Sequence, residues 1–284
     1  MSLMRWSETR VQGRRAGYGA AGLDSPSTSS PVVFLHGWAL SDRTYRRSLE
    51  QLARRGRSVL APAMPGFRST AELPAEQLSL AGYGDWLVEL LDTLGIREPV
   101  ALVGHSFGGA VAIKCAHDHA DRVAQLVLVN SIGGATWSAD GRPRTMSERP
   151  LGDWGVHLGA EMVSTRGLTR VLPVIATDAL THALVRPRTL WRVGRLARKA
   201  DLAAELEQLK QRGTPVAVLW GKEDAVIPWA CAESLFEALG KPQIVTVEGD
   251  HGWLIADPNR FVEVLTNVLD VIGDAGGPGD DRAA

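Results

Sequence analysis

The chain has 284 residues, 45% of them hydrophobic and 22% charged, which is the composition of a folded globular protein and excludes general disorder. Its 31 basic and 32 acidic side chains give a formal charge of -1, so we expect neither nucleic acid nor an anionic membrane as a partner. No apolar run approaches the roughly eighteen residues of a membrane span, and Cys115 and Cys231 lie in apolar helical patterns, so we expect a cytoplasmic protein with reduced thiols.

Short apolar runs alternate with helical patterns over the first 130 residues. Residues 3–20 predict a hairpin at a sheet edge, whereas the runs at 32–35, 59–62, 100–103 and 126–130 predict strands buried on both faces of a sheet. Helical spacing occurs at 49–53, at 80–94 and after Gly109. Alternation of this kind predicts right-handed crossovers and an α/β fold with a mostly parallel, doubly wound sheet.

The pattern changes at residues 132–212, where only helical periodicities occur. Strand and helix patterns return at 215–221, 230–239, 243–247 and 258–272. We therefore predict a core formed by 1–131 and 213–272, a helical cap inserted at 132–212, and a mobile polar tail at 273–284.

The motif Gly104-His105-Ser106-Phe107-Gly108-Gly109 stands between a buried strand and a helical segment. A Gly-x-Ser-x-Gly sequence in this context indicates a nucleophile elbow, where small neighbours allow a strained turn that presents one hydroxyl. Ser106 is therefore the predicted nucleophile, and an incidental serine in a glycine-rich turn is the alternative.

A nucleophilic serine needs a base that accepts its proton and a carboxylate that orients the base. His251 follows the last predicted strand, and Asp224 follows the strand before it. Because the carboxyl ends of parallel strands meet at one edge of a sheet, both side chains can converge on Ser106. Asp250 and Glu223 are rival acids, but Asp250 is adjacent to His251 in sequence, which makes a side-on contact with its ring awkward.

The other histidines and Asn130 have weaker claims to a catalytic role. His36 and His105 belong to backbone motifs, and Asn130 ends a strand but carries no charge to stabilise an imidazolium. The remaining histidines lie in helical patterns and are expected at the surface or in packing: His117, His119, His157 and His182.

Basic and aromatic residues in the insertion have two interpretations each. The basic residues recur at helical spacing, which predicts a solvated helix face or, alternatively, a surface that attracts an anionic substrate. The aromatic residues and a methionine predict cap core or, alternatively, a pocket lining. These residues are Arg188, Arg192, Arg195, Arg198 and Lys199, and Trp137, Trp154, Trp191 and Met162.

The chain order Ser106, Asp224, His251, with His36-Gly37-Trp38 upstream, resembles the α/β-hydrolases that carry a helical cap. The resemblance spans nearly all of the chain and implies an α/β-hydrolase fold. It also favours Asp224 as the acid, because Glu223 is offset by one from the position that the family uses.

The resemblance implies an oxyanion hole formed by the backbone N–H groups of Trp38 and Phe107. Trp38, His105 and Trp253 are expected to contact the substrate. The implied activity is that of a serine hydrolase that cleaves a carboxylic ester or related acyl bond of a small molecule, with no cofactor and no metal. The resemblance implies nothing about the oligomeric state.

Two departures and several alternatives accompany this resemblance. Ala63 and Arg68 stand where the family usually has aspartate and glycine, which concerns the shape of the loop rather than the chemistry. A serine nucleophile argues against epoxide hydrolases and haloalkane dehalogenases, which need a carboxylate. The open alternatives are a perhydrolase, suggested by similarity of residues 36–41 to the cofactor-free haloperoxidase group, a hydrolase of C–C bonds in ring-fission products, and a non-catalytic ligand receptor.

Overall fold

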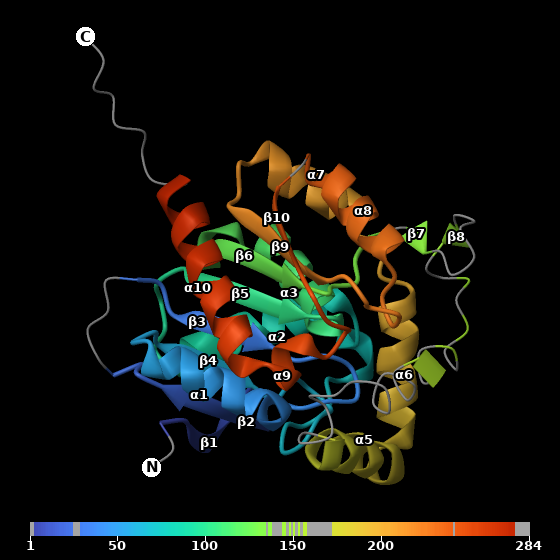
Figure 1. The fold of residues 1–284 in the computed structure, drawn as a ribbon. Helices are drawn as coiled ribbons and strands as arrows, with labels where there is room; N and C mark the ends of the chain where they lie inside the picture. The colour runs from blue at the N-terminus through green and yellow to red at the C-terminus, as the bar shows by residue number, and fades with distance from the viewer. Residues whose placement is uncertain are drawn as a thin grey trace.

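The computed structural model describes residues 3–24, 29–134, 136–137, 144–145, 148, 150, 153, 156–157, 172–240 and 242–275. An eight-stranded sheet runs through the molecule, with helices on both of its faces (Figure 1). This architecture confirms the predicted α/β class. The strands are β1 (Arg5–Val11), β2 (Arg14–Ala21), β3 (Val32–Leu35), β4 (Val59–Pro62), β5 (Val100–His105), β6 (Val123–Val129), β9 (Val216–Gly221) and β10 (Gln243–Val247).

The helices follow the strands as the alternation predicts. They are α1 (Arg46–Arg54), α2 (Leu80–Thr93), α3 (Phe107–Asp118), α5 (Leu172–Val185), α6 (Pro187–Arg198), α7 (Ala203–Gln211), α8 (Trp229–Ala238), α9 (Trp253–Ala256) and α10 (Pro258–Ala275). Short 3₁₀ helices occur at Asp42–Tyr45, Ala75–Gln77 and Ala120–Arg122. No helix in these described ranges combines the length and the apolar composition needed to cross a membrane.

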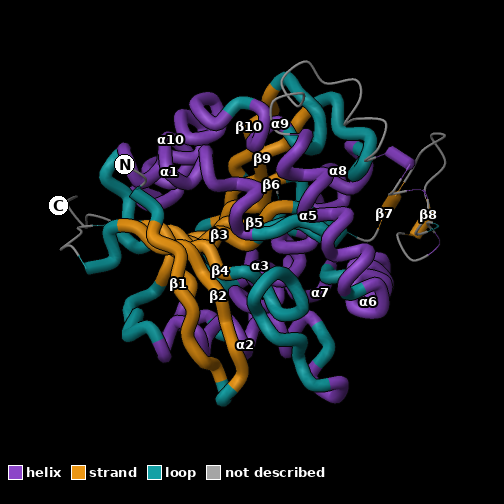
Figure 2. Tube along the Cα trace, turned by 90° about the horizontal axis from the view of Figure 1, so that it is seen from below, coloured by secondary structure: helices purple, strands orange, loops and turns teal. Residues whose placement is uncertain are grey.

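The strand order is β1-β2-β4-β3-β5-β6-β9-β10, which can be followed across Figure 2. The β1–β2 hairpin pairs antiparallel with β4 at one edge, as predicted for residues 3–20, and the other pairings are parallel. Leu35 pairs with Gly104, and His105 pairs with Val129. The loops after β3, β5 and β6 therefore begin side by side at one edge of the sheet.

Side chains of the central strands alternate between two apolar layers, because successive residues of a strand point to opposite faces. Val33 and Leu35 pack on the face covered by α2 and α3, while Val32 and Phe34 pack on the face covered by α1 and α10. Each fully buried side chain of this size contributes about 1.5–3 kcal/mol. These two layers make the sheet a rigid base for the loops at its carboxyl edge.

The insertion between β6 and β9 contains α5, α6 and α7, and α5 lies beside α6 (Figure 1). The insertion is helical, as its periodicities predict, and the structure adds one short strand pair: β7 (Thr136–Trp137) pairs with β8 (Arg144–Thr145). Strands of two residues are too short to produce a detectable periodicity. The boundaries of the predicted cap stay a prediction.

The last described helix, α10, is longer than its apolar pattern predicts. It continues to Ala275, three residues beyond the expected end at 272, so the start of the predicted mobile tail is helical. An apolar pattern marks only the buried part of a helix, and the last buried apolar residue of α10 is Ile272. The helix itself continues for three more residues beyond this position. The rest of the tail lies outside the described residues.

Candidate active site

Ser106 occupies a strained turn between β5 and α3. Its backbone has φ 54° and ψ −118°, a region that residues with a Cβ rarely adopt, and its side chain lies at the carboxyl edge of the sheet. Gly104 and Gly108, the glycines on either side of Ser106 in the Gly-x-Ser-x-Gly sequence, are required by close backbone approach. A Cβ on Gly104 would meet Gly109, and a Cβ on Gly108 would meet the carbonyl of Leu35. The turn therefore has the geometry that a nucleophile elbow requires.

His251 and Asp224 form a buried pair on the loops that follow β10 and β9. The His251 Nδ1–H donates to Asp224 Oδ2 at 2.8 Å, and the two side chains are only 6% and 0% exposed. The other carboxylate oxygen of Asp224 accepts from the backbone N–H of Ile227 at 2.7 Å. A carboxylate on Nδ1 fixes the tautomer in which Nε2 carries no proton and can act as a base.

Asn130 supports this pair from the end of β6. Its Nδ2 donates to Asp224 Oδ2 at 2.5 Å, and its Oδ1 accepts from Trp253 Nε1 at 2.8 Å and from the N–H of Gly221 at 3.3 Å. The sequence placed Asn130 near the site but assigned it no role. The available signal was a polar side chain ending an otherwise apolar strand beside the elbow strand.

His105 connects the loop after β3 with the loop that carries His251. Its Nε2–H donates to the His251 carbonyl at 3.0 Å, and its Nδ1 accepts from the Tyr45 hydroxyl at 2.8 Å. Tyr45 in turn accepts from the N–H of Gly37 at 3.1 Å. Burial lowers the pKa of His105 well below its usual value, which favours the neutral ring whose Nδ1 accepts from Tyr45.

A cavity of about 30 Å³ adjoins both Ser106 and His251. Its other described lining residues are mostly apolar: Gly37, Trp38, Leu40, His105, Phe107, Ile132, Ala197, Val226 and Ile227. Phe107 is the first residue of α3, where backbone N–H groups have no acceptor within the helix. Such an N–H, with the positive end of the helix dipole, favours a negative charge in the cavity.

A family model described as "Alpha/beta hydrolase family" matches residues 32–264. The chain belongs to this family. A putative non-heme haloperoxidase of Mycobacterium phage D29 is 26% identical over 257 residues, which cover 87% of this chain and 90% of that protein. The putative carbamate hydrolase RutD of Caulobacter vibrioides is 32% identical over 223 residues, covering 72% and 76%. The pimeloyl-(acyl-carrier protein) methyl ester esterase of Nitrosomonas europaea is 28% identical over 254 residues, covering 84% and 96%.

The architecture of this alpha/beta hydrolase is the α/β-hydrolase fold that the sequence predicts. The rival acids lie in less suitable positions than Asp224. Glu223 is exposed, and Asp250 accepts from the N–H of Gly252 at 2.9 Å. The His251 ring donates to Asp224 through Nδ1.

The three residues expected to contact substrate lie in different settings. Trp38 borders the cavity, and its indole N–H donates to the Leu190 carbonyl of α6 at 2.8 Å. His105 also borders the cavity, but both of its ring nitrogens are used by protein groups. Trp253 is buried against Phe261, donates to Asn130 and is absent from the described cavity lining, so its position favours a structural role instead.

The remaining histidines mostly pair with surface groups, as their helical patterns predict. His117 contacts Asp118, His119 contacts Asp85, and His157 accompanies Asp153. His182 differs, because it is buried and bonded to two separate loops.

The basic stripe of α6 lies on the solvated side of this alpha/beta hydrolase. Arg188, Arg192 and Arg195 are exposed, and the Arg195 guanidinium lies over the half-exposed ring of Trp191 at 4.5 Å. Both interpretations require exposed side chains, so both stay predictions. Met162, Trp154 and the side chain of Trp137 lie outside the described residues.

Proposed function

We propose that this alpha/beta hydrolase is a serine hydrolase that cleaves a carboxylic ester or related acyl bond of a small molecule. The observation that carries the proposal is the 2.8 Å bond from His251 Nδ1–H to Asp224, beside a cavity that Ser106 and His251 both line. The strained backbone of Ser106 gives further support, because strain is kept where the surrounding structure imposes it.

In the proposed mechanism His251 Nε2 takes the proton of Ser106 as the hydroxyl oxygen attacks the substrate carbonyl carbon. The resulting oxyanion accepts hydrogen bonds from the backbone N–H groups of Trp38 and Phe107, and each such donor typically accounts for about 10²- to 10³-fold in rate. Protonated His251 then gives its proton to the leaving alcohol, which leaves an acyl-enzyme. Water attacks this ester with His251 again as base, the bond to Ser106 Oγ breaks as His251 returns a proton to that oxygen, and the carboxylic acid is released. Asp224 holds the His251 ring in place throughout.

The cavity favours an ester with an apolar acyl group, because Leu40, Ile132, Val226 and Ile227 form much of its wall. Similarity to the esterase supports an ester as the substrate. Similarity to the putative carbamate hydrolase makes a carbamate another candidate substrate, because Ser106 could attack its carbonyl in the same way. The haloperoxidase relative favours a second candidate, in which hydrogen peroxide replaces water in attacking the acyl-enzyme.

The balanced charge and the two cysteines of the chain support the cytoplasm as its location.

The proposal is tested with p-nitrophenyl esters from acetate to octanoate, alongside an activated carbamate and an ester assay containing peroxide. We expect turnover of at least one ester by the wild type, and a loss of at least about 10³-fold in kcat for Ser106→Ala. Ser7→Ala, a change at an exposed serine on β1, is the matched control. Full ester turnover by Ser106→Ala, or binding without turnover by the wild type, would overturn the proposal.

A further inference from the structure

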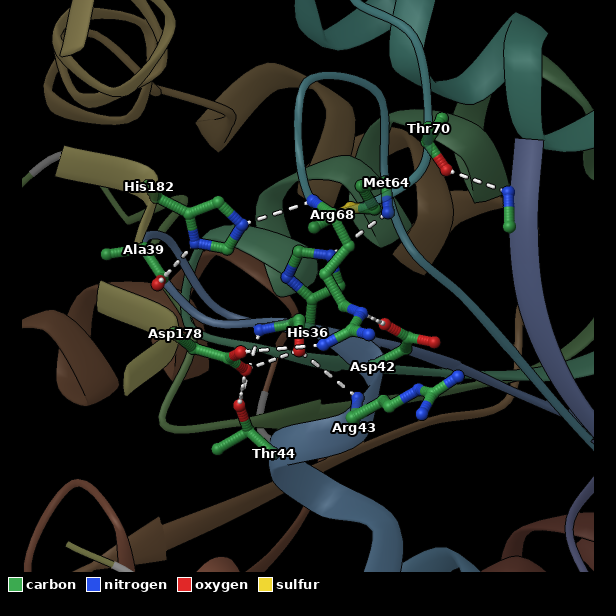
Figure 3. Close-up of polar contacts among 12 residues, drawn as sticks. His36, Ala39, Asp42, Arg43, Thr44, Met64, Arg68, Thr70, Asp178 and His182 are labelled. Atoms are coloured by element: carbon green, nitrogen blue, oxygen red, sulfur yellow. Dashed lines mark hydrogen bonds and ion pairs between the residues drawn. The ribbon is translucent and has the colours of Figure 1, made fainter. Parts of the chain in front are cut away.

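A second polar cluster lies where α5 packs against the core of the molecule (Figure 3). Asp178 and His182, one helical turn apart on α5, are only 7% and 4% exposed. Both face loops of the core rather than solvent: residues 36–44, which follow β3, and residues 64–70, which follow β4. Neither side chain is among the described residues that line the cavity at Ser106.

The ring of His182 bonds to both loops at once. Its Nδ1–H donates to the Ala39 carbonyl at 3.0 Å, and its Nε2 accepts the backbone N–H of Arg68 at 3.1 Å (Figure 3). This pattern requires a neutral ring, and burial lowers the pKa of His182 accordingly. One side chain of the insertion therefore fixes the separation of two core loops.

The two residues that His182 contacts both have unfavourable backbone conformations. Ala39 has φ 64° and Arg68 has φ 44°, values that a residue with a Cβ adopts only where its surroundings hold it. Arg68 also reaches Asp42 at 3.8 Å and Asp178 at 3.7 Å through its guanidinium. These contacts supply the restraint that both strained residues need.

Asp178 holds the far end of the loop after β3. Its Oδ2 accepts hydrogen bonds from the Ser41 hydroxyl and, at 2.6 Å, from the Thr44 hydroxyl. Ser41 also caps the 3₁₀ helix Asp42–Tyr45 by accepting from the N–H of Arg43. The loop is thus tied to α5 at Ala39 and again at Ser41 and Thr44.

The peptide group of Trp38 lies between fixed points on either side. On the preceding residue, the Gly37 N–H donates to Tyr45, and on the following residue the Ala39 carbonyl accepts from His182. The indole of Trp38 is held separately by the Leu190 carbonyl of α6. The Gly37 carbonyl, which is in the same peptide group as the Trp38 N–H, accepts from the His36 Nδ1–H at 2.9 Å and from the Leu40 N–H at 3.3 Å. The direction of the Trp38 N–H therefore depends on these core contacts together with those that the insertion provides at Ala39 and at the indole.

We infer that Asp178 and His182 are positioning residues, through which α5 orients the Trp38 backbone N–H toward the oxyanion formed at Ser106. This inference rests on the proposed function, which assigns that N–H as an oxyanion donor. Misplacing a donor weakens an interaction made in the transition state and leaves ground-state binding largely unchanged. The loss therefore falls on kcat rather than on KM.

The test compares His182→Ala, His182→Asn and Asp178→Asn with Thr181→Ala, a change at an exposed α5 neighbour. We expect His182→Ala to lower kcat by about 10- to 100-fold and to change KM by less than about threefold. This loss of kcat is smaller than the loss expected if an oxyanion donor were removed altogether. The asparagine at 182 offers an N–H near the position of Nδ1, so His182→Asn should recover most of the lost kcat. Thr181→Ala should match the wild type.

Amide hydrogen exchange in peptides covering 36–44 and 64–70 gives a readout that does not need activity. Faster exchange in 36–44 for His182→Ala and Asp178→Asn, with recovery in His182→Asn, supports the inference. Unchanged exchange in 36–44, a loss confined to KM, or a kcat equal to wild type in both variants would overturn it. If the wild-type enzyme does not turn over esters and Ser106 does not react with a fluorophosphonate, the proposed function fails. The oxyanion role of the Trp38 N–H then fails as well, even if the exchange result shows that α5 holds the loop.

Discussion

Asn130 Nδ2 donates at 2.5 Å to the same Asp224 oxygen that accepts the Nδ1–H of His251 at 2.8 Å. A neutral amide on a neighbouring strand thus restrains the carboxylate without placing a second negative charge beside it. The Asn130 carbonyl oxygen is held in turn by the indole of Trp253. Three strand-end loops are joined at this carboxylate.

Replacing Asn130 with alanine should lower kcat by about tenfold and destabilise the fold by about 1–3 kcal/mol, because buried polar partners lose their bonds. Trp253→Phe removes only the indole donor, so its effect on kcat should be smaller. The measurements are ester turnover and urea unfolding of both variants. Wild-type kcat in Asn130→Ala would show that the carboxylate needs no such restraint.

Asp224→Asn should reduce kcat by about 10⁴-fold, since an amide at this place favours the wrong histidine tautomer. Asp250→Asn and Glu223→Gln are the matched controls, and each should retain most of the activity. Steady-state turnover of one ester by the three variants distinguishes them. A large loss in Asp250→Asn with little change in Asp224→Asn would reassign the acid.

Stability should fall as the pH is lowered from 6.5 to about 4. Burial lowers the pKa of His36 to about 4 and also lowers the pKa values of His105 and His182. In this range these histidines bind protons in the unfolded chain but stay neutral in the folded chain. The stabilisation that is present above pH 6.5 is therefore lost as the pH falls. The shift of His36 alone corresponds to roughly 3 kcal/mol. Urea unfolding at pH 7.5, 6, 5 and 4 measures the trend, and a flat profile would contradict it.

Asp42 should act in the opposite direction. Burial raises the pKa of its carboxyl to about 6, and its Oδ1 has no hydrogen-bond partner, although the Arg68 guanidinium lies 3.8 Å away. Between pH 4 and 6 the folded state keeps a proton that the unfolded chain has lost, so this group destabilises the fold progressively as the pH rises. The unfolding free energy of Asp42→Asn relative to wild type should therefore increase between pH 4 and 7. A difference that is constant with pH would refute this assignment.

Local motifs single out Ser106, Asp224 and His251, because each follows a strand whose apolar pattern is visible in the chain. The structure brings His251 and Asp224 into contact, and the catalytic roles of all three stay a prediction. The mostly parallel sheet followed from the alternation of strand and helix patterns, and the edge hairpin from the pattern of residues 3–20. The strand order was not predicted. The role of His182 could not be predicted, because helical periodicity shows that a residue is buried but not which loops it meets. Its partners, Ala39 and Arg68, lie more than 110 residues away in the chain. The contact of Asn130 with Asp224 could not be predicted for a related reason, because a neutral amide has no acid–base chemistry that would mark it as part of a site.

The roles assigned to Ser106 and to the cavity beside it are the central claim. Reaction with a fluorophosphonate, followed by mass spectrometry of the peptides, tests this claim most directly, because the reagent marks only a serine that a base activates. We predict one adduct per chain, located on Ser106, that disappears in Ser106→Ala and forms much more slowly in His251→Ala. An unlabelled wild-type chain, or an adduct on another serine that persists in Ser106→Ala, would contradict it.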